Sequence, residues 1–455
     1  MTHPADLGVV ESVAVLRERR LSSRELVDAC LERIRERDGV HSHDGDPQSL
    51  NAWIRVYEED ARAAAAAADE RLARPEPPPL CGVPIGLKDL YAVAGKPLTA
   101  SSRLLDETPD RSCDVWQSLE RAGMVLLGHL HTHEFALGGT TDQVGNPWAP
   151  DRSPGGSSGG SAAALAARMV AAATGTDTGG SLRIPSALSG VSALKPTYGS
   201  LSLRGIVPLS TSLDHPGPMA RTLEDCGALL AAMTPGRAEP PATLAGVRLA
   251  LSPRAGLTSV DADTADGLER ALDVCRGLGA TIVEPPAPPA PLDVFDDFLV
   301  VLLADLLTWH RRFDGRRELY RQSIREFVEM AEQRALSAEA YVAAATRRRE
   351  ATWGWLDWFA SERLSALLEP TVAIVAPVRG GGYEHPLSDT DLLPFTHYWN
   401  WTGFPVAALP SGVGPRSGLP VGVQLIGPSG SDWRLLSLGI TLQRELGVPQ
   451  PPDPQ

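Results

Sequence analysis

Two glycine- and serine-rich segments that lie close together constrain this chain more than any other feature. The first is Pro154-Gly155-Gly156-Ser157-Ser158-Gly159-Gly160-Ser161, the second is Asp177-Thr178-Gly179-Gly180-Ser181, and small residues join them. Glycines on both sides let the backbone approach a reacting carbonyl group closely and turn its N–H groups toward it. The serines supply reactive hydroxyls in both segments, so the sequence predicts that the chemistry takes place here.

Charge and cysteine usage exclude several function classes. The 455 residues carry a formal net charge of −14 at pH 7, and the longest basic cluster is the short Arg347-Arg348-Arg349, so we expect no direct binding to nucleic acid. The five cysteines lie far apart without a CxxC pair, which argues against a disulfide framework or a structural zinc site. The apolar run 298–307 is interrupted by Asp305 and is too short to cross a bilayer, and the N-terminus lacks a signal pattern. We therefore expect a cytoplasmic protein without a membrane contact.

The order of helical and strand patterns predicts an α/β fold. A capping box, Ser22-Ser23-Arg24-Glu25, and the pattern at 61–73 indicate an N-terminal helical layer over residues 1–75. Residues 295–368 read as a helical insertion, whose tryptophans at 309, 353, 355 and 358 we expect to pack between helices rather than to line a substrate site. Strands are expected at 83–87, 124–128, 247–251, 280–283, 372–376, 406–410 and 421–426. This alternation favours an α/β/α sandwich around a large mixed, mostly buried twisted sheet, in a single domain spanning 1–455.

Lys88 stands at the end of the expected buried strand at 83–87. A lysine at the end of a buried strand is unusual, so we expect a specific role for it. A helix is expected at 161–173, with its N-terminus directed at the first segment, which would bring free N–H groups and the positive end of the helix dipole beside the serines.

These motifs resemble those of the amidase signature family, whose mark is a Gly/Ser-rich stretch that would run here from 154 to 199. The matching pieces are Gly82-Val83-Pro84-Ile85-Gly86-Leu87-Lys88-Asp89, the two segments above with Leu182-Arg183, and Leu194-Lys195-Pro196-Thr197-Tyr198-Gly199. Weaker similarities occur at 212–218, 402–405 and 418–424, so the resemblance covers nearly the whole chain and thins through the insertion.

The resemblance implies a Ser-cisSer-Lys triad that hydrolyses a carboxamide or related C–N bond. Ser181 would be the nucleophile that forms an acyl-enzyme, Ser157 the proton bridge after a cis peptide bond, and Lys88 the base. The backbone N–H groups of Thr178, Gly179, Gly180 and Ser181 would form the oxyanion hole, and Ser158, Asp177 and Arg183 would orient the site. For Arg183, a structural ion pair without a catalytic contact is the competing interpretation. The family implies a small-molecule amide substrate and no metal or organic cofactor, and it leaves a homodimer open.

Other patterns allow other chemistries. His129-Leu130-His131-Thr132-His133 has a plausible metal-ligand spacing, so a metal-dependent amidohydrolase using His129 and His131 is an alternative. Gly156 to Gly160 satisfies G-x-S-x-G with Ser158 as nucleophile, and Ser192-Ala193-Leu194-Lys195 satisfies S-x-x-K. The turn-like sequence before Ser158 and the proline after Lys195 count against these two motifs. Cys81 as a thiol nucleophile has no partner nearby in the sequence.

A further alternative lies within the family. The amidase-type component of a tRNA-dependent amidotransferase uses the same triad to release ammonia from glutamine for a partner protein. His215-Pro216 departs from the pattern expected of that component and mildly favours a stand-alone amidase. A non-enzymatic binding protein is disfavoured because Lys88, Ser157 and Ser181 are all present.

Overall fold

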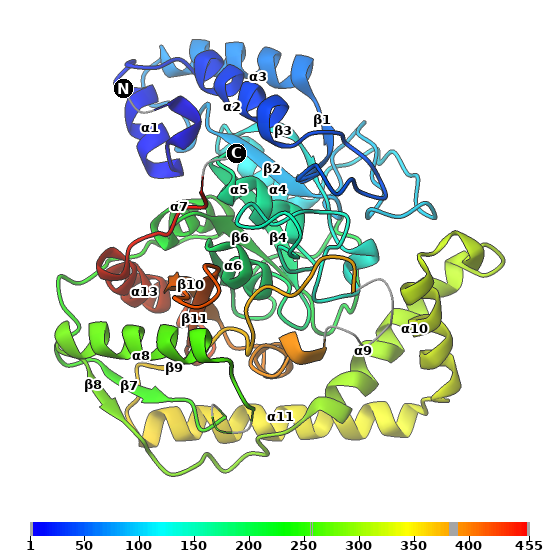
Figure 1. Cartoon of the computed structure of the whole chain (residues 1–455), viewed down its shortest axis with the longest axis vertical. Helices are drawn as coiled ribbons and strands as arrows, with labels where there is room; N and C mark the ends of the chain where they lie inside the picture. Colours follow the sequence, from blue (N-terminus) through cyan, green and yellow to red (C-terminus); the bar gives the residue numbers. More distant parts are fainter. Residues whose placement is uncertain (1–2, 255, 257, 382–389, 453–455) are drawn as a thin grey trace.

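The described residues form one sheet of 11 strands that runs through the molecule (Figure 1). The computed structural model describes residues 3–254, 256, 258–381 and 390–452. The strand order is β1-β3-β2-β4-β6-β5-β10-β11-β9-β7-β8. The strands are β1 (Trp53–Val56), β2 (Pro84–Lys88), β3 (Val125–Leu130), β4 (Ala172–Asp177), β5 (Ser192–Lys195), β6 (His215–Ala220), β7 (Arg248–Leu251), β8 (Thr281–Val283), β9 (Ala366–Pro370), β10 (Val406–Val413) and β11 (Pro420–Ile426).

The sheet is mixed, as the sequence predicted. Strands β3, β2 and β4 are parallel neighbours, and so are β9, β7 and β8. The remaining neighbours pair antiparallel. Strands β2, β4, β5, β6, β9 and β11 are buried along their whole length, and small or apolar residues make up most of each of them.

Helices cover this sheet, which confirms the α/β class. The helices are α1 (Val9–Arg17), α2 (Ser23–Arg37), α3 (Glu58–Leu72), α4 (Asp114–Arg121), α5 (Gly159–Ala166), α6 (Arg183–Ser189), α7 (Leu223–Met233), α8 (Ala262–Gly277), α9 (Phe295–His310), α10 (Gln322–Gln333), α11 (Ala338–Ser361), α12 (His397–Trp401) and α13 (Asp432–Leu446). Helices α5 and α6 contact each other and the central strands, while α7 and α13 contact each other and β5 or β10. None of the described helices is both long enough and apolar enough to cross a membrane.

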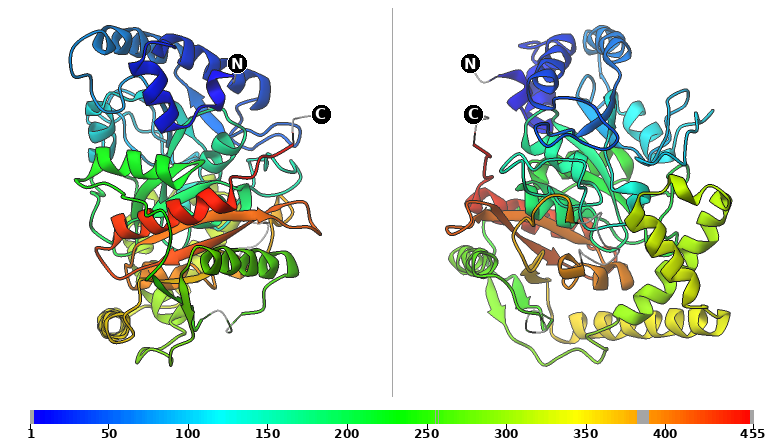
Figure 2. Two further views of the ribbon diagram at one scale, coloured as in Figure 1. Left: turned by 90° about the vertical axis from the view of Figure 1, so that its left-hand side faces the viewer. Right: turned by 45° about the vertical axis from the view of Figure 1, so that its right-hand side comes forward.

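The N-terminal helices and the helices of residues 295–368 lie at opposite ends of the molecule (Figures 1 and 2). The capping box forms as expected, since Ser22 accepts a hydrogen bond from the backbone of Glu25 and Glu25 accepts one from the backbone of Ser22. Residues 1–75 also contain β1, which pairs with β3 at the edge of the sheet. Residues 295–368 form α9, α10 and α11, and then enter β9.

Two predicted elements are wrong in part. The helix expected at 161–173 ends at Ala166, because Ala172 and Ala173 pair with β2 and β6 and this pairing overrides their helix propensity. Residues 372–376 are not a strand, since β9 ends at Pro370. Val372 and Ala376 are buried because they belong to a small apolar cluster with Ile184 and other residues of α6, which accounts for their strand-like composition.

Candidate active site

Lys88 ends the buried strand β2 and is completely enclosed. Its Nζ donates hydrogen bonds to the Oγ of Ser157 at 2.8 Å, to the Oγ of Ser158 at 2.9 Å and to the Oγ1 of Thr176 at 2.9 Å. Burial lowers the pKa of Lys88 to about 7, although the carboxylates of Asp214 and Asp177 act in the opposite direction. A lysine surrounded by hydroxyls in this way can give up its proton near neutral pH.

Ser157 lies where two loops come close together. The Gly156–Ser157 peptide bond is cis. A Cβ atom on Gly156 would lie 1.9 Å from the carbonyl oxygen of Thr140, so only glycine fits at this position. The carbonyl oxygen of Ser157 accepts hydrogen bonds from the backbone N–H of His133 at 3.0 Å and from Thr141 Oγ1 at 3.3 Å. The loop of the first segment is therefore fixed on both sides of Ser157.

The second segment turns sharply after β4 and presents its backbone to a pocket. The Asp177 carboxylate accepts a hydrogen bond from Leu182 N at 3.1 Å, which closes the turn. The carbonyl oxygen of Ser181 accepts one from Ser158 N at 3.3 Å, which joins the two Gly/Ser segments. Among the described contacts, no amide from Thr178 to Ser181 donates a hydrogen bond to the protein. These four amides are thus available to an oxygen atom placed beside them.

Asp177 and Arg183 form an ion pair that is fully buried. The guanidinium makes two parallel hydrogen bonds to the carboxylate, Nε to Oδ2 and Nη2 to Oδ1, both at 2.9 Å. Burial is the largest single influence on the pKa of Asp177 and would raise it, but the charge and hydrogen bonds of Arg183, together with Lys195 and Asn400, hold that pKa well below its usual range. Asn400 of α12 donates to both the carbonyl oxygen and the carboxylate of Asp177, and Thr396 Oγ1 donates to the carbonyl oxygen of Gly179 at 2.5 Å.

Asp214 is a second buried carboxylate beside this turn, and no sequence motif predicted a role for it. It accepts hydrogen bonds from Thr178 Oγ1 at 2.5 Å and from the backbone N–H of Leu209 at 3.0 Å. Burial raises the pKa of Asp214 to about 7, despite these donors and the nearby charge of Lys88. Asp214 therefore anchors the start of the turn and contributes to the field around Lys88.

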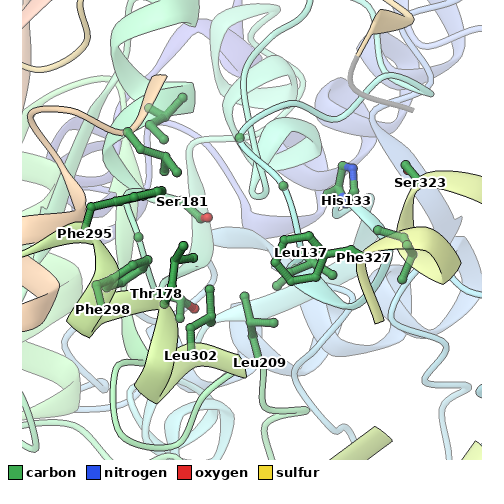
Figure 3. Close-up of a pocket in the computed structure, with 18 residues that line it drawn as sticks. His133, Leu137, Thr178, Ser181, Leu209, Phe295, Phe298, Leu302, Ser323 and Phe327 are labelled. Carbon is green, nitrogen blue, oxygen red and sulfur yellow. The ribbon is translucent and has the colours of Figure 1, made fainter. Parts of the chain in front are cut away.

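Ser181 opens onto an apolar pocket (Figure 3). The pocket measures about 740 Å³ including its open mouth. In Figure 3 the Ser181 hydroxyl lies between Phe295 and Phe298 on one side and Leu137 and Phe327 on the other. The lining residues are His133, Ala136, Leu137, Gly138, Gly139, Thr178, Gly179, Ser181, Ile184, Leu209, Phe295, Phe298, Leu299, Leu302, Ser323, Ile324, Phe327 and Leu393.

None of the four tryptophans singled out in the insertion is among these described lining residues. Trp355 packs against Trp358 and Trp399, while Trp353 is 61% exposed. The phenylalanines of α9 and α10 form the wall instead. The sequence shows those helices as apolar, but not which of their faces meets the second Gly/Ser segment.

The histidine cluster does not form a metal site. Both ring nitrogens of His129 are engaged, Nδ1 with the Tyr57 hydroxyl at 2.7 Å and Nε2 with the carbonyl oxygen of Tyr91 at 3.0 Å. Strand β3 ends at Leu130, so His131 and His133 lie beyond it rather than on one side of a strand. Among the described residues, no group of three or more His, Cys, Asp or Glu side chains has metal-binding geometry.

The remaining alternatives also lack the geometry they need. Ser158 is the residue directly before α5 and follows a loop rather than a hydrophobic strand. Ser192 and Lys195 lie three residues apart on strand β5, where their side chains point to opposite faces. Burial raises the pKa of the Cys81 thiol, so this sulfur is not an activated nucleophile. All five cysteines are buried and free.

Comparison with known proteins identifies the family. A sequence model of the family described as Amidase matches residues 25–436, which is most of the chain. The chain belongs to the Amidase family. Relatives within the Amidase family carry two different names. The A subunit of the glutamyl-tRNA(Gln) amidotransferase from Halorhodospira halophila is 37% identical, and the alignment covers 96% of each chain. An amidase from Pseudomonas putida is 35% identical over 89% of each chain.

A solved Amidase-family structure has the same fold. A crystal structure of an amidase superimposes with a TM-score of 0.85 at 29% identity, and the match covers 97% of this chain and 100% of that chain. The fold and the action on C–N bonds therefore follow from family membership. The names of the relatives do not distinguish a stand-alone amidase from an amidotransferase component, so the structure of the site has to be considered for this question.

Proposed function

We propose that this protein is a stand-alone amidase that hydrolyses a carboxamide through an acyl-enzyme on Ser181. The observation that carries the proposal is the enclosed Lys88 amine, which contacts Ser157 at 2.8 Å and has a pKa lowered to about 7. A neutral amine in this position can accept a proton from Ser157, and Ser157 can in turn accept one from Ser181.

The two half-reactions follow from this proton path. The Ser181 oxygen attacks the amide carbon while its proton passes through Ser157 to Lys88. The oxyanion that forms receives hydrogen bonds from the amides between Thr178 and Ser181, of which one donor is worth about 2.7–4 kcal/mol in comparable sites. The C–N bond then breaks as the proton returns to the leaving nitrogen, releasing ammonia or an amine. Water, deprotonated along the same path, hydrolyses the ester and regenerates Ser181.

Other residues near Ser181 hold the reacting groups in place. Ser158 contacts both Lys88 and the backbone of Ser181, so it links the base to the nucleophile segment. The Asp177–Arg183 pair closes the turn that carries the four amides. These contacts support a positioning role for Ser158, Asp177 and Arg183.

A second candidate is the amidase-type component of an amidotransferase, which releases ammonia from glutamine. The name of the Halorhodospira halophila relative favours it. Such a component would depend on partner proteins to use the ammonia. Incubation with glutamine, with and without candidate partner proteins, distinguishes the two: the amidase proposed here hydrolyses other amides alone, and added partners do not change its rate.

The direct test is Ser181→Ala. We expect the variant to lose at least about 10⁴-fold in kcat/KM toward any amide that the wild type hydrolyses, because it removes the oxygen that attacks the amide carbon. A fluorophosphonate probe should label the wild type at Ser181, as read by peptide mass spectrometry, and should not label the variant. Retained hydrolysis by Ser181→Ala, together with labelling at another serine, would refute the proposal.

A further inference from the structure

The wall opposite Ser181 is built from one face of each of two insertion helices. Helix α9 contributes Phe295, Phe298, Leu299 and Leu302, and helix α10 contributes Ser323, Ile324 and Phe327. Phe295, Phe298 and Leu302 are three or four residues apart, as are Ser323 or Ile324 and Phe327, and this spacing places each set on one side of its helix. The insertion therefore supplies apolar side chains on both sides of the proposed nucleophile (Figure 3).

Phe298 brings this surface up to the amides of the second Gly/Ser segment. A Cβ atom on Gly179 would lie 3.2 Å from Cζ of Phe298 and 3.5 Å from a methyl carbon of Leu393. Phe295 stacks on Phe298 with ring centroids 6.2 Å apart and planes 21° apart. A group attached to a carbonyl held by those amides would contact a hydrocarbon surface at once.

The pocket offers no charge to a substrate. None of the described residues that line it is Asp, Glu, Lys or Arg. Its polar side chains are His133, Thr178, Ser181 and Ser323. The Thr178 hydroxyl is already used by Asp214, and burial lowers the pKa of His133 to about 3, which leaves its imidazole neutral at pH 7. Placing an ammonium or carboxylate group in such a pocket without a partner is strongly unfavourable.

We propose that the natural substrate is an uncharged amide whose carbonyl bears a hydrophobic acyl group of ring or short branched-alkyl size, selected by Phe298 and Phe327. This inference rests on the proposed function, since it assumes that Ser181 attacks the carbonyl. Free glutamine does not meet this description, because at neutral pH it carries both an ammonium and a carboxylate group.

We assign the pocket to the acyl group because this group stays bonded to Ser181 through both half-reactions. Contacts that hold it assist formation and hydrolysis of the ester alike, whereas contacts to the leaving amine end when the C–N bond breaks. A pocket of about 740 Å³ including its mouth has room for one ring with a short chain.

Ammonia release from primary amides tests the proposal, since only the acyl group varies in such a series. We expect kcat/KM for benzamide, phenylacetamide, 3-phenylpropanamide or 3-methylbutanamide to exceed that for acetamide by at least about 100-fold for the best of them, because each well-buried methylene contributes about 10-fold or more. Glutamine should be hydrolysed no faster than acetamide. A preference for glutamine, or equal rates across the series, overturns the inference.

The Phe298→Ala variant tests whether Phe298 is the residue that selects the acyl group. This variant should lose about 10- to 100-fold in kcat/KM toward the best aryl or alkyl amide and clearly less toward acetamide, because a single methyl group buries far less apolar surface against the ring. The matched control is Trp353→Ala, which removes an aromatic side chain that is 61% exposed on α11 and outside the pocket; its rates should equal those of the wild type. If Phe298→Ala slows all amides equally, Phe298 does not select the acyl group.

Binding to the Ser181→Ala variant separates this inference from the proposed function and does not depend on turnover. Calorimetry with the best aryl or alkyl amide should show binding with a negative heat-capacity change, and glutamine should not bind detectably. Labelling of Ser181 by a fluorophosphonate with glutamine as the preferred substrate would leave the proposed catalysis intact and overturn the substrate class. Absence of labelling, with activity retained in Ser181→Ala, would overturn the catalysis itself.

Discussion

The polar cluster around Lys88 and the apolar pocket beside it differ in which parts of the chain build them. The cluster comes from the central strands β2 and β4 and from the two Gly/Ser segments, and the side chains of Lys88, Ser157, Ser158 and Thr176 that form it are buried. The pocket takes seven of its 18 lining residues, including Phe295, Phe298 and Phe327, from α9 and α10, which lie outside the sheet. On the proposed function, the reaction depends on the buried cluster, and the choice of substrate depends on helices that lie outside the sheet.

The comparison predicts that changes in the cluster act on every substrate alike. Lys88→Met should lower kcat/KM by about 10²- to 10⁴-fold for acetamide and for aryl amides equally, because it removes the proposed base and not a binding surface. The wild type should show a pH–rate profile that rises as pH increases through about 7, where Lys88 loses its proton. For the Lys88→Met variant, kcat/KM should not rise with pH in this range. A loss confined to one class of amide would contradict the division between the two regions.

The Lys88→Met variant should also change how the stability of the protein depends on pH. The pKa of Lys88 falls from 10.5 to about 7 on folding, so between these values the unfolded chain binds a proton that the folded chain does not. Wild-type stability therefore rises with pH from about 7 to about 10.5, by at most roughly 5 kcal/mol. Lys88→Met removes this dependence, so its melting temperature relative to the wild type should be higher at pH 7 than at pH 10. An equal difference at both pH values would contradict the low pKa.

A second change in the cluster tests how much the Asp177–Arg183 ion pair contributes to the free energy of unfolding. Arg183→Met should destabilise the protein by about 3–5 kcal/mol, because it leaves the buried carboxylate of Asp177 without its counter-charge. Urea unfolding measures this loss. The matched control is Arg317→Met on the insertion, whose partner Glu332 is 43% exposed, and where we expect about 0–1 kcal/mol. Similar costs for the two variants would show that the Asp177–Arg183 pair is no more important than a surface pair.

How far the sequence alone predicts the molecule differs between the same two regions. The Gly/Ser segments, the strand ending at Lys88 and the mixed sheet are recoverable because glycine positions and buried runs are local signals. Strands β1, β5, β6 and β9 were not predicted. Strand β6, for example, reads His-Pro-Gly-Pro-Met-Ala, and prolines normally argue against a central strand. Strand β4 was assigned in part to a helix because its first residues are alanines.

The pocket was not recoverable in the same way. Aromatic residues in the insertion are visible in the sequence, but their roles depend on how α9 and α10 dock onto the sheet, which is a long-range contact. The sequence draws attention to the tryptophans, of which Trp355 is a core residue and Trp353 is exposed, and gives no reason to select Phe295, Phe298 and Phe327. Asp214 was overlooked as well, because only the folded chain brings it to Thr178 and near Lys88.

Asp214→Asn measures how strongly that overlooked carboxylate acts on the base. The negative charge of Asp214 raises the pKa of Lys88, so its removal should shift the acid limb of kcat/KM to lower pH, by less than about one unit. Asparagine keeps an oxygen that accepts from Thr178. The control is Asp225→Asn, which alters a buried carboxylate on α7 that hydrogen-bonds Thr222 and the backbone of Val10. A limb that stays in place, or moves to higher pH, would show that Asp214 does not act on Lys88.

The smallest expected effect is that of a chelator. Dialysis against EDTA should leave kcat/KM unchanged, because the proposed path moves protons only through Lys88, Ser157 and Ser181. His129 belongs to the alternative metal site considered from the sequence. The carbonyl oxygen of Tyr91 can only accept a hydrogen bond, so Nε2 of His129 carries the proton and donates it there. Nδ1 of the neutral ring therefore accepts the hydrogen bond from the Tyr57 hydroxyl. Neither nitrogen is left for a metal ion. Activity that falls after dialysis and returns with added Zn²⁺ would place the chemistry outside the lysine–serine cluster and end the comparison drawn between the two regions.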